Sequence, residues 1–180
     1  YGYVLDSTPV SFDVTEENST QEGGITLIKV DKPNMAQKGT ISVEKTGEVF
    51  FGVNVSGEEN KDVIYQPVYK VKGLAGAVYE ITADEDIITP DGTLRYHKGD
   101  VVDTVTTDED GTAKSKELYL GKYTVVETKA PTGMVINKEK HSVELAYAGQ
   151  DVAVTETSTS FYNERQKVKI SLEKILEQDE

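Results

Sequence analysis

Apolar and polar residues alternate along most of the chain, which predicts β-strands rather than helices. Tyr123, Val125 and Glu127 fall on one face of one such strand, between Gly121 and Pro131. The opposite face carries Thr124 and Thr128 around Val126, so the tyrosine and valine face is expected to point into the core. Glu127 therefore ends an apolar face, and a buried carboxyl group needs a partner, a proton or a reaction to take part in.

Two other predicted strands also end an apolar face with a polar residue. In residues 40–45 that residue is Lys45, and in residues 158–163 it is Asn163. Three strand faces thus end in an amine, a carboxylic acid and an amide. An ion pair of Lys45 and Glu127, with Asn163 as a hydrogen-bonding neighbour, satisfies this pattern as well as a reactive cluster does.

The remaining strand candidates are short and are separated by turn residues, such as those at 90–92 and 108–111. Residues 46–72 form a longer connection, predicted to be a hairpin that turns near residues 57–60. No stretch shows helical periodicity. Closely spaced strands with turns between them predict an all-β sandwich.

An internal repeat divides the chain. The aligned pairs are residues 2–4 with 133–135, 10–12 with 141–143, and 34–45 with 163–174. A repeat of this length indicates a module of ordinary domain size whose neighbours lie on the same polypeptide.

The repeat sets three expected domain boundaries. Residues 37–165 are predicted to be a complete domain, residues 1–36 the C-terminal strands of a preceding repeat, and residues 166–180 the first strand of a following repeat. The strands expected in the first part are at residues 2–5, 10–14 and 25–30.

Charge and composition exclude several classes of function. The net charge is −13, from 32 acidic and 19 basic residues, which disfavours nucleic acid and anionic membranes as partners. Cysteine is absent, so disulfides and thiol chemistry are excluded. No apolar run is long enough to insert into a membrane. No P-loop or dinucleotide fingerprint points to a cofactor.

A metal site is not expected either. His97 and His141 are the only histidines, and both are predicted to lie solvated at the surface. Asp108-Glu109-Asp110-Gly111 has the composition of part of a calcium loop but lacks its full spacing, so a turn is the better interpretation.

Residues 73–81 (GLAGAVYEI), residues 120–133 (LGKYTVVETKAPTG) and Asn163 carry a family resemblance. Together they resemble the Cna protein B-type, or SpaA-type, prealbumin-like domains of Gram-positive surface adhesins and pilins. The resemblance implies a reverse immunoglobulin-like β-sandwich repeat in an extracellular, cell-wall-anchored surface protein. Its role would be that of a structural stalk module.

Many members of this family form an intramolecular isopeptide bond, and the resemblance implies roles for three residues. Glu127 would promote the bond, Lys45 would supply the amine and Asn163 the amide. Burial lowers the pKa of a lysine and favours a neutral carboxylic acid, so Glu127 is expected to donate to the Asn163 carbonyl oxygen and to take a proton from Lys45. The reaction happens once, so the protein is not expected to be an enzyme.

The expected partners are neighbouring repeats of the same polypeptide, with a host extracellular matrix protein or glycan bound through other domains. One alternative is a ligand-binding module that grips a host protein or glycan with the 46–72 insertion or with the loops near residues 84–100. An exposed aromatic groove formed by Phe50, Phe51, Tyr65 and Tyr69 would favour it. Another is a carboxylate-based hydrolase, which would need a second acid facing Glu127.

Overall fold

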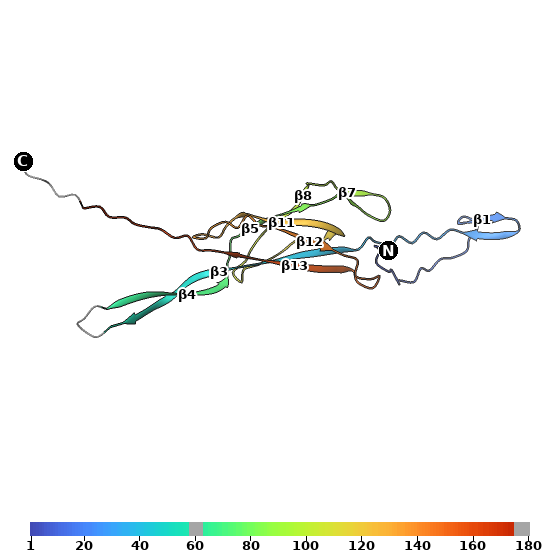
Figure 1. Ribbon diagram of the computed structural model, residues 1–180. Helices are drawn as coiled ribbons and strands as arrows, with labels where there is room; N and C mark the ends of the chain where they lie inside the picture. The colour runs from blue at the N-terminus through green and yellow to red at the C-terminus, as the bar shows by residue number, and fades with distance from the viewer. Residues whose placement is uncertain (58–62, 175–180) are drawn as a thin grey trace, which may run out of the picture.

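The computed structural model describes residues 1–57 and 63–174, which form thirteen β-strands and no helix. Two mostly antiparallel sheets pack face to face and make the sandwich (Figure 1). Most of the predicted turn at residues 57–60 lies outside the described residues. Within residues 1–57 and 63–174 there is no helix long and apolar enough to cross a membrane.

The first sheet contains the first and last strands of the sandwich side by side. Its strands are β3 (Lys38–Ser56), β4 (Ile64–Gly73), β9 (Thr112–Lys114), β10 (Leu118–Tyr119) and β13 (Val154–Asn163). β13 runs parallel to β3, with Phe161 beside Lys45 and Asn163 beside Gly47. Strands far apart in the sequence therefore meet at the same end of the sheet.

The second sheet has the order β12-β11-β5-β8 and is antiparallel throughout. Its strands are β5 (Val78–Ala83), β8 (Val101–Thr106), β11 (Gly121–Lys129) and β12 (Lys140–Leu145). A small hairpin, β6 (Ile87–Ile88) with β7 (Leu94–Tyr96), lies beside it. Glu127 of β11 pairs with Tyr79 of β5.

The core lies between the two sheets and is built from the predicted apolar faces. Its fully buried side chains include Ile41 and Val43 of β3, Tyr79 and Ile81 of β5, and Tyr123 and Val125 of β11. Period-two alternation places these side chains on one face of each strand, and burying them stabilises the sandwich. The predicted all-β sandwich is confirmed.

The second half of β3 leaves the sandwich and pairs with β4 as a two-stranded ribbon (Figure 1). The predicted hairpin in residues 46–72 is thus confirmed, as a continuation of the first strand rather than a separate element. The ribbon points to the end where the chain leaves β13. Arg165 connects the two, since its Nε donates to Glu48 (3.3 Å) and its guanidinium lies 3.7 Å from the ring centroid of Tyr69.

The strands expected in residues 1–36 are only partly right. β2 (Ile25–Ile28) falls where a strand was predicted, and it pairs with β1 (Ser19–Glu22), which was not predicted. Residues 10–14 form no strand, so that prediction was wrong. Their alternating side chains are exposed, 58% for Phe12, and no strand within residues 1–57 and 63–174 pairs with them.

Candidate functional site

The three polar residues predicted to end apolar strand faces meet at one end of the core. Lys45 comes from β3, Asn163 from β13 and Glu127 from β11 in the opposite sheet. Their exposed fractions are 0%, 1% and 2%. Because Lys45 and Asn163 lie on adjacent parallel strands and Glu127 faces them, the cluster spans both sheets.

The side chains are in direct polar contact. Lys45 Nζ lies 3.1 Å from Glu127 Oε1 and donates a hydrogen bond to Asn163 Oδ1. Asn163 Nδ2 donates to both carboxylate oxygens of Glu127, at 2.9 and 3.0 Å. Every pair among the three residues is therefore joined.

The orientation of the amide differs from the sequence-based expectation. Glu127 was expected to donate to the carbonyl oxygen of Asn163, but that oxygen accepts from Lys45 and the amide nitrogen faces Glu127. An ammonium group can only donate, and an ionised carboxylate can only accept, so this orientation satisfies both. Lys45 and Glu127 thus form an ion pair, and both are hydrogen-bonded to the Asn163 amide.

Two aromatic rings wall the amine. The rings of Tyr79 and Phe161 lie 4.8 Å apart, and Lys45 Nζ is 6.0 and 5.9 Å from their centroids. Burial lowers the pKa of Lys45 below its ordinary value, and the hydrogen bond and charge of Glu127 only partly oppose this. The surroundings thus make the neutral, nucleophilic form of the amine easier to reach than it is for an exposed lysine.

Tyr79 also faces Glu127. Burial, and then the nearby charge of Glu127, raise the pKa of the Tyr79 hydroxyl above its ordinary range. The hydroxyl is buried and has no hydrogen-bond partner among the described residues. Tyr79 therefore stays neutral and supplies an apolar wall to the site.

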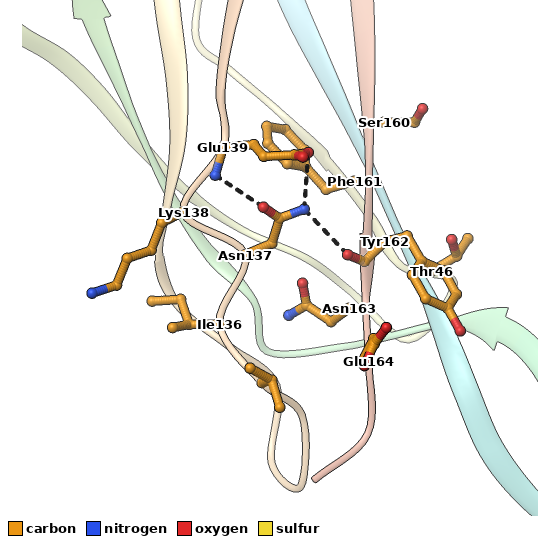
Figure 2. Close-up of a pocket in the computed structure, with 11 residues that line it drawn as sticks. Thr46, Ile136, Asn137, Lys138, Glu139, Ser160, Phe161, Tyr162, Asn163 and Glu164 are labelled. Carbon is orange, nitrogen blue, oxygen red and sulfur yellow. Dashed lines mark hydrogen bonds between the residues drawn. The ribbon is translucent and has the colours of Figure 1, made fainter.

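A backbone group that sequence reasoning missed completes the surroundings of Glu127. The amide N–H of Asn137 donates to Glu127 Oε2 at 2.6 Å. The Asn137 side chain holds the loop in place through hydrogen bonds to Tyr162 O (3.2 Å) and from Glu139 N (2.9 Å), as Figure 2 shows. A backbone donor carries no residue signature, so no sequence pattern could have identified it.

The loop that contains Asn137 lies beside the site. Residues 135–139 lie against the end of β13, with a surface pocket between them, and Asn163 points inward from that strand (Figure 2). The carboxylate of Glu127 thus accepts from a loop on one side and from the cluster on the other. This fixes its orientation toward Lys45 and Asn163.

Two close backbone approaches position Lys45. Its N–H donates to Gly111 O (2.7 Å), and its carbonyl oxygen accepts from Leu74 N (3.0 Å). Gly111 has a φ of +81°, and a Cβ there would lie 2.3 Å from the Lys45 carbonyl oxygen. The turn at residues 108–111, predicted as a turn and confirmed as one, therefore anchors the lysine.

The other candidates remain outside this cluster. His97 is exposed, as predicted, but His141 is half-buried: its ring stacks on Phe161 at 3.9 Å and contacts Thr159 Oγ1 at 2.7 Å. The prediction of a solvated His141 was wrong because alternation in β12 turns its ring toward β13 of the other sheet. Among residues 1–57 and 63–174, no group of three His, Cys, Asp or Glu side chains could hold a metal ion.

Several solved structures are similar to this chain. The major pilin SpaD from Corynebacterium diphtheriae is 21% identical, with a TM-score of 0.45, over 72% of this chain and 30% of that one. The minor pilin GBS52 of Streptococcus agalactiae is 17% identical, with a TM-score of 0.44, over 92% and 61%. The major pilin subunit BcpA of Bacillus cereus, in a variant form, is 23% identical, with a TM-score of 0.39, over 71% and 29%.

This chain spans less than two thirds of the length of each of these proteins. A comparison with curated proteins gave no match. The family described as "SpaA: Prealbumin-like fold domain" matches residues 67–160, just over half of the chain. The matched range contains β5, β11 and most of β13, and it confirms the predicted resemblance and the predicted immunoglobulin-like, prealbumin-like fold class. The chain belongs to the SpaA prealbumin-like fold family.

Proposed function

We propose that this protein is a structural stalk module of a Gram-positive cell-surface pilin or adhesin, held by an intramolecular isopeptide bond between Lys45 and Asn163. The observation that carries the proposal is the buried contact of the Lys45 amine with the Asn163 amide, with Glu127 touching both. Membership of the SpaA family supports the extracellular, cell-wall-anchored setting. The protein acts on itself once and is not an enzyme.

The geometry supports a proton path from the attacking nitrogen to the leaving nitrogen. Glu127 Oε1 lies 3.1 Å from Lys45 Nζ and 2.9 Å from Asn163 Nδ2. Glu127 takes a proton from the ammonium group, which frees the amine lone pair, and it then delivers a proton to Nδ2. One carboxyl group can thus serve both nitrogens without moving.

The reaction exchanges one bond of the Asn163 side chain for another and conserves its protons. The Nζ–Cγ bond forms, the Cγ–Nδ2 bond breaks, and ammonia leaves. Nζ gives up two protons to Glu127 in succession, one before the attack and one after the Nζ–Cγ bond has formed. Glu127 passes the first to Nδ2 and the second to the departing ammonia, which leaves as ammonium, so the carboxylate returns to its starting state. Because β3 and β13 hold the reacting groups side by side before reaction, the fold replaces a bimolecular encounter by a high effective concentration.

The position of the bond suits a stalk. The chain enters the sandwich at one end through β3 and leaves it after β13 at the other (Figure 1). A link between Lys45 and Asn163 bypasses the intervening sequence, a separation of 118 residues. Tension applied to the two ends would pass through the covalent link, so the core between them would not be pulled apart.

The contacts of Glu127 do not favour the hydrolase alternative, which needs a second acid opposite it. The groups that meet its carboxylate are the Lys45 amine, the Asn163 amide and the Asn137 backbone N–H. All three are hydrogen-bond donors. They suit a carboxyl group that relays protons between nitrogens.

The aromatic side chains of the β3–β4 ribbon bear on the ligand-binding alternative. Phe51 is covered by the Lys70 amine, 3.2 Å from its ring centroid, and Tyr69 is covered by Arg165. Phe50 packs edge-on against Tyr69, with 6.2 Å between their centroids. Phe50, Phe51 and Tyr65 nevertheless remain 61%, 55% and 68% exposed, so the ribbon keeps exposed aromatic rings of the kind that the ligand-binding alternative would use.

Intact mass tests the proposed bond directly. The wild-type chain is expected to be lighter than its sequence by one ammonia molecule, and Glu127→Ala is expected to restore the full mass because the proton path is lost. Glu156→Ala, which removes an exposed carboxylate at the surface, serves as the control and should keep the mass loss. A wild-type chain of full mass would exclude the bond.

A pH dependence is expected once the bond cannot form. In Asn163→Ala the Lys45 amine stays free, and burial lowers its pKa in the folded protein. At pH values between this lowered pKa and the ordinary pKa of lysine, the unfolded chain therefore binds more protons than the folded one. Stability of this variant should therefore rise with pH across that window. In the wild type the nitrogen is an amide and does not titrate, so the deficit of the variant should shrink as pH rises.

Chemical denaturation at a series of pH values measures that deficit. Burial raises the pKa of Tyr79 and Tyr123, which lowers stability at high pH in both proteins and cancels in the difference. A double variant, Lys45→Met with Asn163→Ala, has no lysine to titrate and should show a constant difference. A pH-independent deficit in Asn163→Ala itself would contradict a free buried amine.

A further inference from the structure

A short backbone pairing marks the end of the sandwich where the chain enters. Tyr3 forms an isolated antiparallel bridge with Ala36. Val4 N donates to Met35 O (2.9 Å), and Gln37 N donates to Gly2 O (2.8 Å). The segment that leads into β3, residues 35–37, is thus hydrogen-bonded to residues 2–4.

The same pairing recurs where the chain leaves the sandwich. Met134 forms an isolated antiparallel bridge with Arg165. Val135 N donates to Glu164 O (2.7 Å), and Gln166 N donates to Gly133 O (2.8 Å). Each donor and acceptor occupies the position that the sequence repeat aligns with its counterpart at the entry end. The glycines also match, with φ values of +82° at Gly2 and +79° at Gly133.

At the entry end, the sandwich covers this pairing through a buried glutamine. The Gln37 side chain is 1% exposed. Its Nε2 donates to Gly149 O (2.9 Å) and Val152 O, and its Oε1 accepts from Ala148 N (2.9 Å). The turn at residues 148–152 therefore satisfies both ends of the amide.

Further contacts fix the entering chain against the same end. Leu5 N donates to Gln150 O (2.8 Å), and the rings of Tyr1 and Tyr147 lie 4.7 Å apart. Gly2 packs so closely on Pro90 that a Cβ there would lie 2.6 Å from Pro90 Cγ. The entry pairing is thus docked on the module through polar, aromatic and close backbone contacts.

At the exit end, the equivalent groups are open. A Cβ at Gly133 would meet nothing within 4 Å, and Gln166, which aligns with Gln37, is exposed. The exit pairing, of residues 133–135 with 164–166, has the same backbone geometry as the entry pairing. Among the described residues it lacks a counterpart of the 148–152 turn that covers the entry pairing. The two ends of the module are therefore complementary to one another.

We propose that residues 133–135 and 164–166 form a docking surface for the next module of the same polypeptide. The counterpart of the 148–152 turn would take up the Gln166 side chain as the present turn takes up that of Gln37. This inference rests on the proposed division into residues 1–36, 37–165 and 166–180, and it does not depend on the isopeptide bond. It makes successive modules a stiff array with a fixed orientation at each junction.

The entry junction can be tested in the full chain by amide hydrogen exchange. Gln37→Ala is expected to speed exchange at the Leu5 and Ala148 amides by about tenfold or more, because the buried amide that holds the turn is lost. Gln166→Ala is the matched control and should leave both amides unchanged. Equal exchange in wild type and Gln37→Ala would overturn the role given to the glutamine.

The exit junction needs a chain that carries the module twice, residues 1–165 followed directly by residues 37–180. Residual dipolar couplings from the two modules are expected to fit one common alignment, and replacing the glutamine at the join by alanine should separate them into two. Independent alignment with the glutamine present would overturn the proposal. Intact mass of the same sample reports the isopeptide bond separately, so failure of one inference is distinguishable from failure of the other.

Discussion

Asn163→Ala is expected to lower the free energy of unfolding by about 5 kcal/mol or more. A cross-link stabilises a fold mainly by restricting the unfolded chain, and a loop of about 100 residues corresponds to about 4.7 kcal/mol in the chain-entropy account. The loop between Lys45 and Asn163 is of this size, with a separation of 118 residues. Asn163→Ala also leaves a buried ionisable amine at Lys45 where the cross-linked wild type has a neutral amide, which adds to the effect.

Repeating the Asn163→Ala substitution in a Lys45→Met protein separates the contribution of the covalent bond to stability from that of the hydrogen bonds. In Lys45→Met no amine is present, so adding Asn163→Ala removes only hydrogen bonds, which corresponds to about 1–3 kcal/mol. Urea denaturation of the four proteins gives both differences. A loss of the same size with and without Lys45 would mean that the cluster is an ion pair with a neighbouring amide and no bond.

Strand parity in the sequence singled out the three residues of the cluster, and the family resemblance was needed to predict that they meet. Lys45, Glu127 and Asn163 each end an apolar face, and side chains on one face of a strand share one environment. Parity cannot say which strands are neighbours. That information came from the parallel pairing of β3 with β13, which is a long-range contact with no local signature.

Local patterns could not predict the details inside the site. The orientation of the Asn163 amide depends on which neighbour donates and which accepts, and the donor from Asn137 is a backbone group. His141 shows the same limit, because its burial comes from stacking on Phe161 of another strand. Such features follow from tertiary packing and not from residue type.

The first 36 residues show where alternation misleads. Val10, Phe12 and Val14 alternate as a strand should, yet they are exposed and unpaired in the described structure. A strand needs a neighbour to accept its backbone hydrogen bonds and a surface to cover its apolar face. The extension of β3 into the ribbon shows the converse, since β4 supplies the pairing that keeps residues 47–56 extended.

Gly111→Ala is expected to destabilise the fold by about 2–5 kcal/mol and to slow formation of the proposed bond. The added methyl group would lie 2.3 Å from the Lys45 carbonyl oxygen and 2.6 Å from Leu74 N, so it would separate two groups that are hydrogen-bonded at 3.0 Å. Overpacking of this kind costs about 1–3 kcal/mol, and a left-handed alanine adds about 1–2 kcal/mol. Displacing the backbone of Lys45 moves its amine away from Asn163.

Gly92→Ala is the matched control for this effect. Gly92 has the same φ of +81°, but a Cβ there would meet nothing within 4 Å. It should therefore show only the backbone strain, about 1–2 kcal/mol, and bond formation at the wild-type rate. Thermal unfolding gives the first quantity, and intact mass followed over time after refolding gives the second. If both alanine variants slowed the loss of ammonia equally, the close approach at Gly111 would not be what positions Lys45.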